Sequence, residues 1–410
     1  MGVEKSEKDV VIVAGVRTPF GRFGGSLKDF DVYELSAIVM KELLRRVNLN
    51  GDVVNEVYWG VGDTAQCKDV YTPVVARQAL LKAGLPPETV SLSLDTACCS
   101  SMTATQLAWR AIRVGDIEVA ISGGVTIFSK EPLILRGLRW KGSRLGHIQL
   151  EDPLYFLGYK DFAPVAVDTG EVALEHGITR EQQDIWALRS HQKYGKAWKE
   201  GKFKDEMIPL EIRQEDGTVK VLEIDEQYRP DTTLEKLSKL PTIYGSPTVT
   251  AGNAPGLNDG ATALLIMSRR KAEEFGLKPL GKIVTMARVC LKPRLLAEAP
   301  AAAIEKALSQ ANLTLDDMKL LEINEAFAAQ PLVSTKILAE KYFSNERRLE
   351  DLREKTNVNG GAIAIGHPNT ASGARLIMTI LYELRRRGGG YGVASICGGL
   401  AQGDAVIVEV

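Results

Sequence analysis

The chain has 410 residues, 45% of them hydrophobic, and carries 51 Lys and Arg against 52 Asp and Glu, for a formal net charge of -1. This composition can bury a large core and favours two or more domains, which excludes a disordered chain. The balanced charge excludes a nucleic-acid or membrane surface recognised by bulk charge, so we expect neither partner.

The first residues, MGVEKSEKDVVIVAG, contain charges and no sustained apolar stretch, unlike a secretory signal. No uninterrupted run of about 18 apolar residues occurs anywhere, so no transmembrane helix is predicted. We therefore expect a cytoplasmic protein. The cysteines are odd in number and form no CxxC pair, which favours reduced thiols over disulfides or a metal site. They stand at positions 67, 98, 99, 290 and 397.

Short β-branched segments alternate with helical patterns along the first part of the chain. Strands are predicted at 10–15 and 56–62, and helices at 32–47 and 73–85. Such alternation indicates an α/β fold in which helices cover the sheets.

The chain then repeats its own plan. A strand at 90–96 leads past Cys98 to a helix at 100–115, and the next strand ends in two glycines. A glycine turn leads past His367 to a helix at 371–388, and that next strand also ends in two glycines. We predict two related halves with Cys98 and His367 at matching helix entries, where backbone N–H groups can stabilise negative charge.

The segment between the halves has a different composition. From 127 to 247 it is rich in charged and aromatic residues, with one long polar helix predicted at 180–202 and no regular strand alternation. The α/β pattern resumes at 248–268, and a further strand is predicted at 282–289. We therefore predict an N-terminal domain at 1–276 that contains an inserted loop domain at 127–247, and a C-terminal domain at 277–410.

Three residues in small-residue frames carry the candidate chemistry: Cys98 in DTACCSSM, His367 in NGGAIAIGHP and Cys397 in ICGGLAQG. A cysteine becomes nucleophilic where a histidine and a helix N-terminus favour its thiolate, which suggests covalent acyl chemistry with the second cysteine in proton transfer. The competing interpretation of a free cysteine is a small buried hydrophobe, and we keep it for Cys67, Cys99 and Cys290. The other histidines are interpreted as solvated or structural: His147, His176 and His191.

Blocks along nearly the whole chain resemble the thiolases. They are VAGVRTPFGRFGGSL, ARQA, TAGNAPGLNDGA, NEAF, NGGAIAIGHP and the CGG turn, in the family's order. The resemblance implies a thiolase fold, with two α/β halves in a layered α-β-α-β-α arrangement plus the loop domain. It also implies an acyltransferase that condenses acyl-CoA thioesters or cleaves a 3-oxoacyl-CoA with CoA. Coenzyme A would be a co-substrate, with no permanently bound cofactor or metal, and the chain would form a homodimer or homotetramer.

The resemblance also assigns roles. Cys98 matches the nucleophile, His367 the base that takes its proton, and Cys397 the acid/base that serves the carbanion. Asn324 matches the residue that holds a water at the enolate oxygen, although it could instead cap a helix starting at Glu325. The backbone N–H groups of Cys98 and Gly399 match the oxyanion hole of the tetrahedral intermediate.

Coenzyme A contacts are implied in the same way. Arg229 matches the arginine that contacts the adenine nucleotide, its alternative being an ordinary surface arginine. Ala326 and Phe327 match positions that line the pantetheine channel. Pro255 stands where the family usually has a serine, so one polar contact to pantetheine is expected to be missing.

Departures from the family gather around the acyl pocket. Pro164–Ala166 replace a usual His-Met-Gly, and Asn369 with Thr370 replaces a usual Leu-Gly. We expect a substrate bulkier or more polar than acetoacetyl-CoA, aryl or dicarboxylic and resembling benzoylsuccinyl-CoA, in fatty acid or aromatic acid degradation. Four cations could serve a second carboxylate, or simply form solvated surface: Arg136, Arg139, Lys141 and Arg144.

Three alternatives stay open. The first is a generic acetyl-CoA C-acetyltransferase, and the second is a ketosynthase-like condensing enzyme, against which Cys397 argues. The third is a non-catalytic acyl-CoA-binding subunit, against which the presence of all three reactive residues argues. A small zinc-containing partner subunit is also compatible with the sequence.

Overall fold

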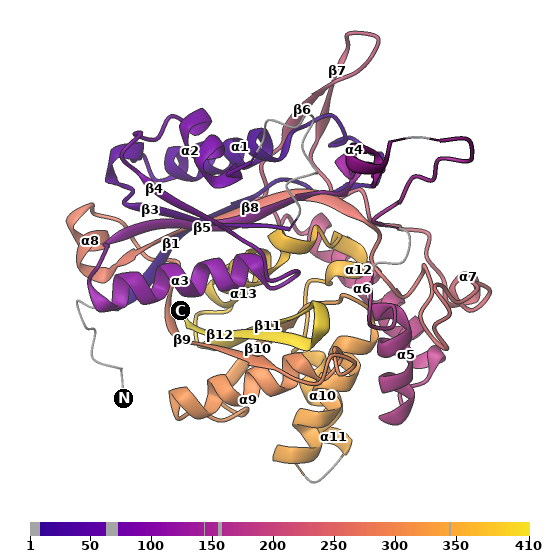
Figure 1. Cartoon of the computed structure of the whole chain (residues 1–410). Helices are drawn as coiled ribbons and strands as arrows, with labels where there is room; N and C mark the ends of the chain where they lie inside the picture. The colour runs from indigo at the N-terminus through magenta and orange to yellow at the C-terminus, as the bar shows by residue number, and fades with distance from the viewer. Residues whose placement is uncertain (1–8, 63–72, 143, 155–157, 344–345) are drawn as a thin grey trace.

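The computed structural model describes residues 9–62, 73–142, 144–154, 158–343 and 346–410, so Cys67 lies outside the described residues (Figure 1). The N-terminal half builds a mixed sheet in the order β1-β8-β5-β3-β4, with the short β2 paired to β8. These strands are β1 (Val10–Arg17), β2 (Gly21–Arg22), β3 (Glu56–Val61), β4 (Val90–Leu94), β5 (Val119–Ile127) and β8 (Asn258–Ser268).

The C-terminal half builds its sheet on the same plan. Its strands are β9 (Gly281–Cys290), β10 (Met318–Ile323), β11 (Tyr391–Gly398) and β12 (Gln402–Glu409). β10 runs parallel to β11, β11 antiparallel to β12, and β12 antiparallel to β9. In the first half β3 is parallel to β5, β5 antiparallel to β8, and β8 antiparallel to β1. The identical pairing sequence confirms the two related halves.

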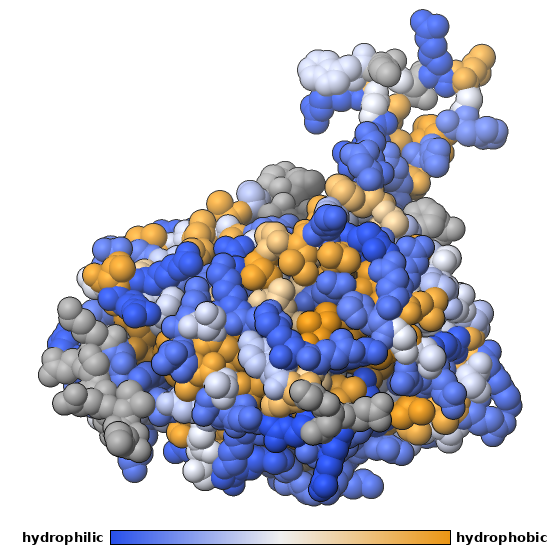
Figure 2. Space-filling model, turned by 90° about the horizontal axis from the view of Figure 1, so that it is seen from below, coloured by the Kyte–Doolittle hydropathy of each residue, from blue (hydrophilic) through white to orange (hydrophobic). Residues whose placement is uncertain are grey.

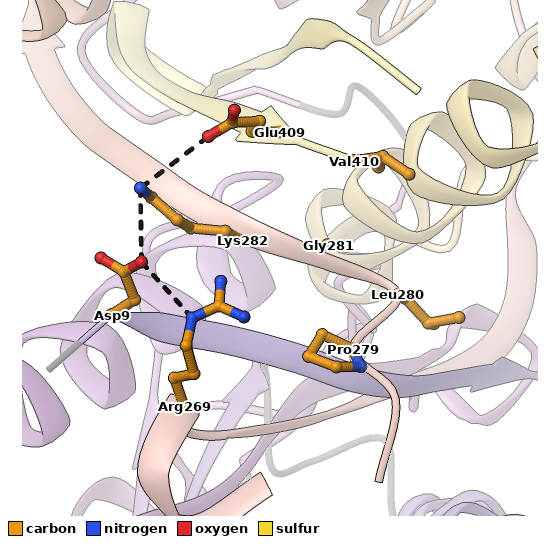
Figure 3. A pocket seen from close by; sticks show the side chains of 8 residues that line it. All are labelled: Asp9, Arg269, Pro279, Leu280, Gly281, Lys282, Glu409 and Val410. Carbon is orange, nitrogen blue, oxygen red and sulfur yellow. Dashed lines mark ion pairs between the residues drawn. The ribbon is translucent and has the colours of Figure 1, made fainter. Parts of the chain in front are cut away.

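The two halves also share one hydrogen-bonded edge. β1 pairs with β9 through Val11 with Lys282 and Ile12 with Gly281, which makes one continuous ten-stranded sheet within the described chain. A charged cavity of about 280 Å³ lies at this junction (Figure 3). Asp9 pairs there with Arg269 and Lys282, each at 3.5 Å. Because these charges pair with one another, the cavity is best explained as part of the junction between the halves.

Helices form three layers around the sheets, as predicted (Figure 1). α1 and α2 cover the outer face of the first sheet, α3 and α13 pack against each other between the two sheets, and α9 and α10 lie on the far side of the second. Their bounds are α1 (Val32–Arg46), α2 (Val75–Ala83), α3 (Ser100–Val114), α9 (Ala299–Ala311), α10 (Ala329–Tyr342) and α13 (Ser372–Arg386). Shorter helices are α8 (Arg269–Glu274), α11 (Glu346–Glu354) and α12 (Ala362–Ile365).

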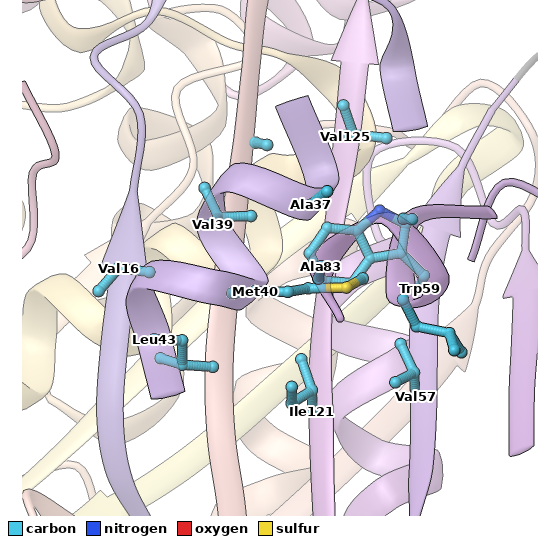
Figure 4. Close-up of a cluster of buried hydrophobic side chains, with 14 of the residues drawn as sticks. Val16, Ala37, Val39, Met40, Leu43, Val57, Trp59, Ala83, Ile121 and Val125 are labelled. Atoms are coloured by element: carbon cyan, nitrogen blue, oxygen red, sulfur yellow. The ribbon is translucent and has the colours of Figure 1, made fainter. Parts of the chain in front are cut away.

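The core of the first half is centred on Trp59 of β3 (Figure 4). Its ring is fully buried among side chains of α1, and its indole N–H donates to Ser36 Oγ at 2.9 Å, so burial leaves no unsatisfied donor. A Cβ on Gly123 of β5 would lie 2.5 Å from the Trp59 ring. Only glycine allows the strand to approach this closely, which explains the first of the two glycine pairs.

The segment predicted as an insertion contains α4 (Leu138–Lys141), α5 (Val165–Glu175), α6 (Arg180–Lys199), β6 (Leu210–Arg213), β7 (Val219–Leu222) and α7 (Leu234–Ser238). The predicted polar helix is α6, which begins with a capping box between Thr179 and Gln182. The β6–β7 hairpin was not predicted. β7 has exposed residues at three consecutive positions, so it lacks the alternation that marks a strand. The domain boundaries themselves stay a prediction.

A buried ionic network anchors this segment to both halves. Arg17 of β1 is fully buried and binds Glu206 and Asp225 at 2.7 Å each. Tyr194 of α6 donates to Asp225 at 3.0 Å, and Thr379 of α13 donates to Glu206 at 3.0 Å. Moving these carboxylates away would leave the buried Arg17 charge uncompensated, which favours this docking of the segment.

The segment around α4 is the most exposed part of the described chain. It projects from the body as an arm in which polar and apolar side chains are interleaved (Figures 1 and 2). Its exposed apolar residues include Leu133, Leu135, Leu138, Trp140, Leu145, Ile148 and Leu150. No helix in the described part of the chain is long and apolar enough to cross a membrane.

Candidate active site

Cys98 lies in a tight turn between β4 and α3. The Ala97 backbone is left-handed, with φ of 53°, and its N–H donates to Asp95 Oδ1 at 2.7 Å. Ser100 Oγ accepts the Thr96 N–H at 2.9 Å, which closes the turn. This geometry presents Cys98 at the start of α3, where the free N–H groups of the first helical turn lie.

His367 follows the short α12 and reaches the same place from the other half. Its backbone N–H donates to Asn258 Oδ1 at 2.9 Å, and its Nδ1 lies 2.7 Å from Ser372 Oγ. Its Nε2 lies 3.3 Å from Cys98 Sγ. The predicted pair of helix entries therefore places an imidazole against a thiol.

A chain of hydrogen bonds fixes the histidine tautomer. Arg375 donates to Asn324 Oδ1 at 3.4 Å, so the Asn324 amide nitrogen faces His367 Nε2, at 3.5 Å. Nε2 is then an acceptor and Nδ1 carries the proton, which it donates to Ser372. Arg375 is fully buried and also binds Glu322 at 3.3 Å. His367 is thus held as a neutral base that faces Cys98.

Burial keeps both members of the pair neutral. It lowers the pKa of His367 to about 3, with a smaller effect from the nearby Arg375 cation. Burial raises the pKa of Cys98, the residue's own backbone N–H lowers it and the Asp95 carboxylate raises it, with a net value of about 12. The resting state is a thiol beside an imidazole rather than an ion pair.

Cys397 lies near the end of β11 and is 1% exposed. A Cβ on the adjacent Gly398 would lie 2.8 Å from the Thr96 carbonyl oxygen and 3.0 Å from Cys99 Sγ, so only glycine lets β11 reach the Cys98 turn. Burial raises the pKa of Cys397 well above its usual value, and the next contribution comes from Cys98. Cys397 therefore lies close enough to Cys98 for the two thiols to interact electrostatically.

Asn324 is part of this cluster and not a helix cap. It follows β10, and its backbone N–H donates to the Ser395 carbonyl at 2.9 Å. α10 begins only at Ala329, with Ala328 as its cap. The alternative in which Asn324 caps a helix starting at Glu325 is therefore wrong.

Glu325 is a buried residue that the motif analysis overlooked. Its carboxylate accepts hydrogen bonds from Trp186 and Ser190 of α6, each at 2.8 Å, and from Asn357 at 2.9 Å. A Cβ on Gly361 would lie 2.2 Å from the Glu325 carboxyl carbon. Glu325 thus ties the loop of Asn324 to α6 and to the glycine turn before His367. Its place inside the NEAF block was the available signal.

Two further polar side chains border Cys98. Asn369, noted above only as a departure, has its Oδ1 2.6 Å from Cys98 Sγ. Tyr159 comes from the loop before α5, and its Oη lies 1.5 Å from where a Cβ of Gly399 would stand. Burial raises the pKa of Tyr159 to about 12, followed by the effect of Cys98. Tyr159 carried no motif, and only tertiary contact reveals it.

Of the proposed coenzyme A residues, Arg229 borders a separate cavity of about 200 Å³. Arg229 is exposed at this cavity, and its backbone N–H donates to His191 Nδ1 at 3.3 Å. His191 is buried and neutral, because burial and the Arg229 cation lower its pKa to about 4. The lining includes His191, Gln227, Arg229, Asp231, Thr232, Lys236, Gly252 and Ala254.

An apolar cluster connects this cavity to Cys397. Ala326 and Phe327, both under 10% exposed, pack in one cluster with Cys397 and with Ala254 of the cavity lining. Pro255, half-buried, follows Ala254 directly. The residues assigned to a pantetheine channel thus lie between the arginine and the second cysteine.

The remaining candidates lie elsewhere. Cys99 is buried as expected, but Cys290 is exposed near the end of β9, so its interpretation as a buried hydrophobe is wrong. His147 is exposed, and His176 lies 2.9 Å from Glu298. The arginines of the arm are exposed, Arg136 pairs with Glu151 at 2.9 Å, and the side chain of Lys141 lies outside the described set. Among the described residues, no group of three or more His, Cys, Asp or Glu side chains could hold a metal ion.

Known proteins share this architecture. The chain is 42% identical to an acetyl-CoA acetyltransferase of Chromobacterium violaceum, over 98% of this chain and 99% of that one. It is 39% identical to a beta-ketoadipyl-CoA thiolase of Pseudomonas aeruginosa, with the same coverage. The crystal structure of human mitochondrial 3-ketoacyl-CoA thiolase in complex with CoA matches with a TM-score of 0.89 and 38% identity, over 98% of both chains.

Family models match both halves: the thiolase N-terminal domain at residues 10–270 and the thiolase C-terminal domain at residues 277–410. These matches agree with the paired halves and with the thiol–imidazole contact that they create. The chain therefore belongs to the thiolase family and is an acyltransferase.

Proposed function

We propose that this thiolase cleaves a 3-oxoacyl-CoA with CoA through an acyl intermediate on Cys98. The observation that carries the proposal is the contact of 3.3 Å between Cys98 Sγ and His367 Nε2, with Cys397 beside it. A second thiol next to the first favours a thiolase over a ketosynthase-like enzyme, which has no need of it. Retention of all three groups in one cluster argues against a non-catalytic acyl-CoA-binding subunit.

In the first step the Cys98 sulfur attacks the 3-oxo carbon while its proton passes to His367 Nε2. Because the thiol has a pKa of about 12 and the imidazole of about 3, a free ion pair is strongly disfavoured, so proton transfer accompanies S–C bond formation. The C2–C3 bond then breaks and its electron pair goes to the enolate of the departing acyl-CoA, which is acetyl-CoA when C2 is unsubstituted. The Cys397 thiol protonates C2, which leaves the acyl group on Cys98.

In the second step CoA attacks the acyl–Cys98 thioester. The CoA thiol gives its proton to the Cys397 thiolate, the C–S bond to Cys98 breaks, and the Cys98 sulfur recovers its proton from His367. The first half-reaction leaves His367 protonated and Cys397 as a thiolate, and the second returns both groups to their starting states. The same groups run the condensation in reverse, and we assign the degradative direction because thiolysis of a simple 3-oxoacyl-CoA is downhill.

Two sets of donors would stabilise the oxygens that gain charge. Once protonated, His367 can donate to the enolate oxygen, together with a water held by Asn324, whose amide is oriented by Arg375. The backbone N–H groups of Cys98 and Gly399 would serve the tetrahedral intermediate. Donors fixed before the reaction lower the barrier because they need no reorganisation.

Coenzyme A would bind through Arg229 at the small cavity, and its pantetheine would pass Ala326 and Phe327 toward Cys397. The support is Ala254, which lines the cavity and packs in one apolar cluster with Ala326, Phe327 and Cys397. Pro255 has no N–H and no side-chain hydroxyl, so one polar contact would be absent there.

The substrate is proposed to be bulkier or more polar than acetoacetyl-CoA, either aryl or dicarboxylic, in fatty acid or aromatic acid degradation. The polar groups of Asn369 at the reacting sulfur and of Tyr159 at Gly399 support a polar acyl group. A relative named for beta-ketoadipyl-CoA supports the dicarboxylic class. The exposed arginines of the arm give no support, since Arg136 already pairs with Glu151. Relatives named acetyl-CoA acetyltransferase support the generic alternative.

One experiment tests both reaction and substrate. The purified Cys397→Ala variant is incubated with acetoacetyl-CoA, 3-oxoadipyl-CoA, benzoylsuccinyl-CoA and unbranched 3-oxoacyl-CoAs, and the trapped acyl group is identified by intact mass and peptide mapping. We expect an adduct on Cys98, with acetoacetyl-CoA a poor substrate for the unmodified enzyme. An adduct on Cys99 or Cys290 contradicts the nucleophile, and efficient turnover of acetoacetyl-CoA contradicts the substrate class.

A homodimer or homotetramer is proposed as the working form, in the cytoplasm. β4 is the last strand of its sheet, and its Val90 and Leu92 are 58% and 46% exposed. An edge strand with apolar side chains favours pairing with another chain. The apolar residues of the arm offer a second contact surface, and light scattering of the purified protein measures the state directly.

A further inference from the structure

Asn369 touches the reacting sulfur but has no part in the mechanism so far. It opens the short turn between His367 and α13, and its backbone N–H donates to the His367 carbonyl at 2.8 Å. Its side chain is half-buried, and its Oδ1 is 2.6 Å from Cys98 Sγ. The turn that orients the base therefore also delivers an amide to the nucleophile.

The amide and the imidazole compete for one proton. A thiol carries a single hydrogen, so Cys98 can donate either to Asn369 Oδ1 at 2.6 Å or to His367 Nε2 at 3.3 Å. The closer acceptor is the amide oxygen. Nε2 meanwhile has a donor of its own in Asn324. In the resting geometry the proton thus points away from the base.

We propose that Asn369 is a further catalytic residue, which holds Cys98 as a neutral thiol turned toward its amide oxygen. The inference rests on the proposed function of Cys98 as nucleophile. For attack, the S–H hydrogen leaves Oδ1 and passes to His367 Nε2, the S–C bond forms, and the carbonyl π pair moves to the substrate oxygen. The Cys98 thiol is thereby kept unreactive until a bound acyl-CoA takes the place of the Asn369 amide oxygen beside it.

The surroundings of the Cys98 sulfur allow the effect of the Asn369 hydrogen bond on thiol reactivity to be measured separately. In the described part of the chain, the titratable groups that act on or contact the Cys98 thiol come from its own turn, from β11, from the loop before α5 and from the turn of His367. They are Asp95, Cys99, Cys397, Tyr159 and His367. The Arg375 cation lowers the pKa of the His367 imidazole. Replacing a neutral amide leaves these groups in place and removes one hydrogen bond to the neutral thiol.

The test measures alkylation of Cys98 by iodoacetamide in the full chain, with peptide mass spectrometry at several pH values between about 7 and 9. Only the thiolate reacts, so the rate reports how strongly the neutral thiol is held. Asn369→Leu should accelerate alkylation about threefold to tenfold at each pH, the value of one lost hydrogen bond. Asn369→Asp should slow it, because a carboxylate disfavours the neighbouring thiolate.

Exposed Cys290 provides the control within each sample, since its rate should not change. Asn369→Ala repeats the measurement with a smaller side chain, and thermal melting shows which variants are folded. An unchanged or slower Cys98 rate in folded Asn369→Leu or Asn369→Ala overturns the proposal. Thiolysis is assayed separately: its complete absence in the unmodified enzyme contradicts the proposed function, while the alkylation rates still decide the role of Asn369.

Discussion

The sulfur of Cys98 lies 3.3 Å from Nε2 of His367, although 269 positions separate the two residues in the chain. One belongs to the turn before α3 and the other to the turn before α13, and these helices pack against each other between the sheets. The proposed nucleophile and its base thus depend on the docking of two halves that each have their own sheet. Substitutions where α3 packs against α13 should therefore lower the reaction rate before they affect the folding of either half.

Stability should depend on pH through His367. Burial lowers its folded pKa to about 3, against about 6.5 in the unfolded chain, so its contribution is complete above pH 6.5 and is lost as pH falls toward 3. Between pH 6.5 and about 5 the loss is ~2 kcal/mol. His367→Asn should lose less stability over this range in urea unfolding. Equal losses in both proteins would show that the imidazole is not held neutral.

Removal of the Asn324 amide should lower turnover without unfolding the protein. Asn324→Ala deletes the group that Arg375 orients toward His367, and loss of one such donor costs about 10²–10³-fold in kcat in other enzymes. Steady-state thiolysis and thermal melting check this. A variant with normal kcat and a much lower Tm would assign Asn324 a purely structural role.

Gly399 and Tyr159 should show coupled effects. A methyl group at position 399 would stand 1.5 Å from the Tyr159 hydroxyl oxygen, so Gly399→Ala must displace the tyrosine or the turn that carries the proposed oxyanion donor. We expect a loss of activity in the single variant and a recovery of about tenfold or more when Tyr159→Ala is added. Additive effects of the two substitutions on kcat/KM would exclude this contact as the cause.

Arg229 should affect coenzyme A binding alone. Arg229→Ala removes a cation at the small cavity, away from the sulfur and the imidazole, so KM for CoA should rise about tenfold with kcat nearly unchanged. Arg213→Ala, an exposed arginine on β6, is the matched control and should change neither constant. A fall in kcat with constant KM would place Arg229 outside the CoA site.

Much of the fold was predictable because its signals are local. The alternation of apolar segments gave α1, α6 and α13 to within a few residues, and the second glycine pair marked the end of β11. The first pair was wrongly expected to end its strand, because Gly123 and Gly124 lie inside β5, which continues to Ile127. Prediction failed where local signals were weak or shared. The strands of the β6–β7 hairpin have only four residues each, too few for a clear periodic signal. The alternative of a helix starting at Glu325 failed because Asn324 and Glu325 point into the protein as hydrogen-bonding side chains, and α10 starts at Ala329.

The sequence alone determined which reactive groups exist and in what order they occur: two cysteines and a histidine in small-residue frames, in blocks that resemble the thiolases. Only the tertiary structure decided their distances and protonation, because burial and neighbouring charges belong to the packed state and not to any segment. It also supplied the partners that no motif marks, Arg375 behind Asn324 and Asn369 against the sulfur of Cys98. Hydrogen bonds of about 3 Å between distant residues arise only when whole elements dock.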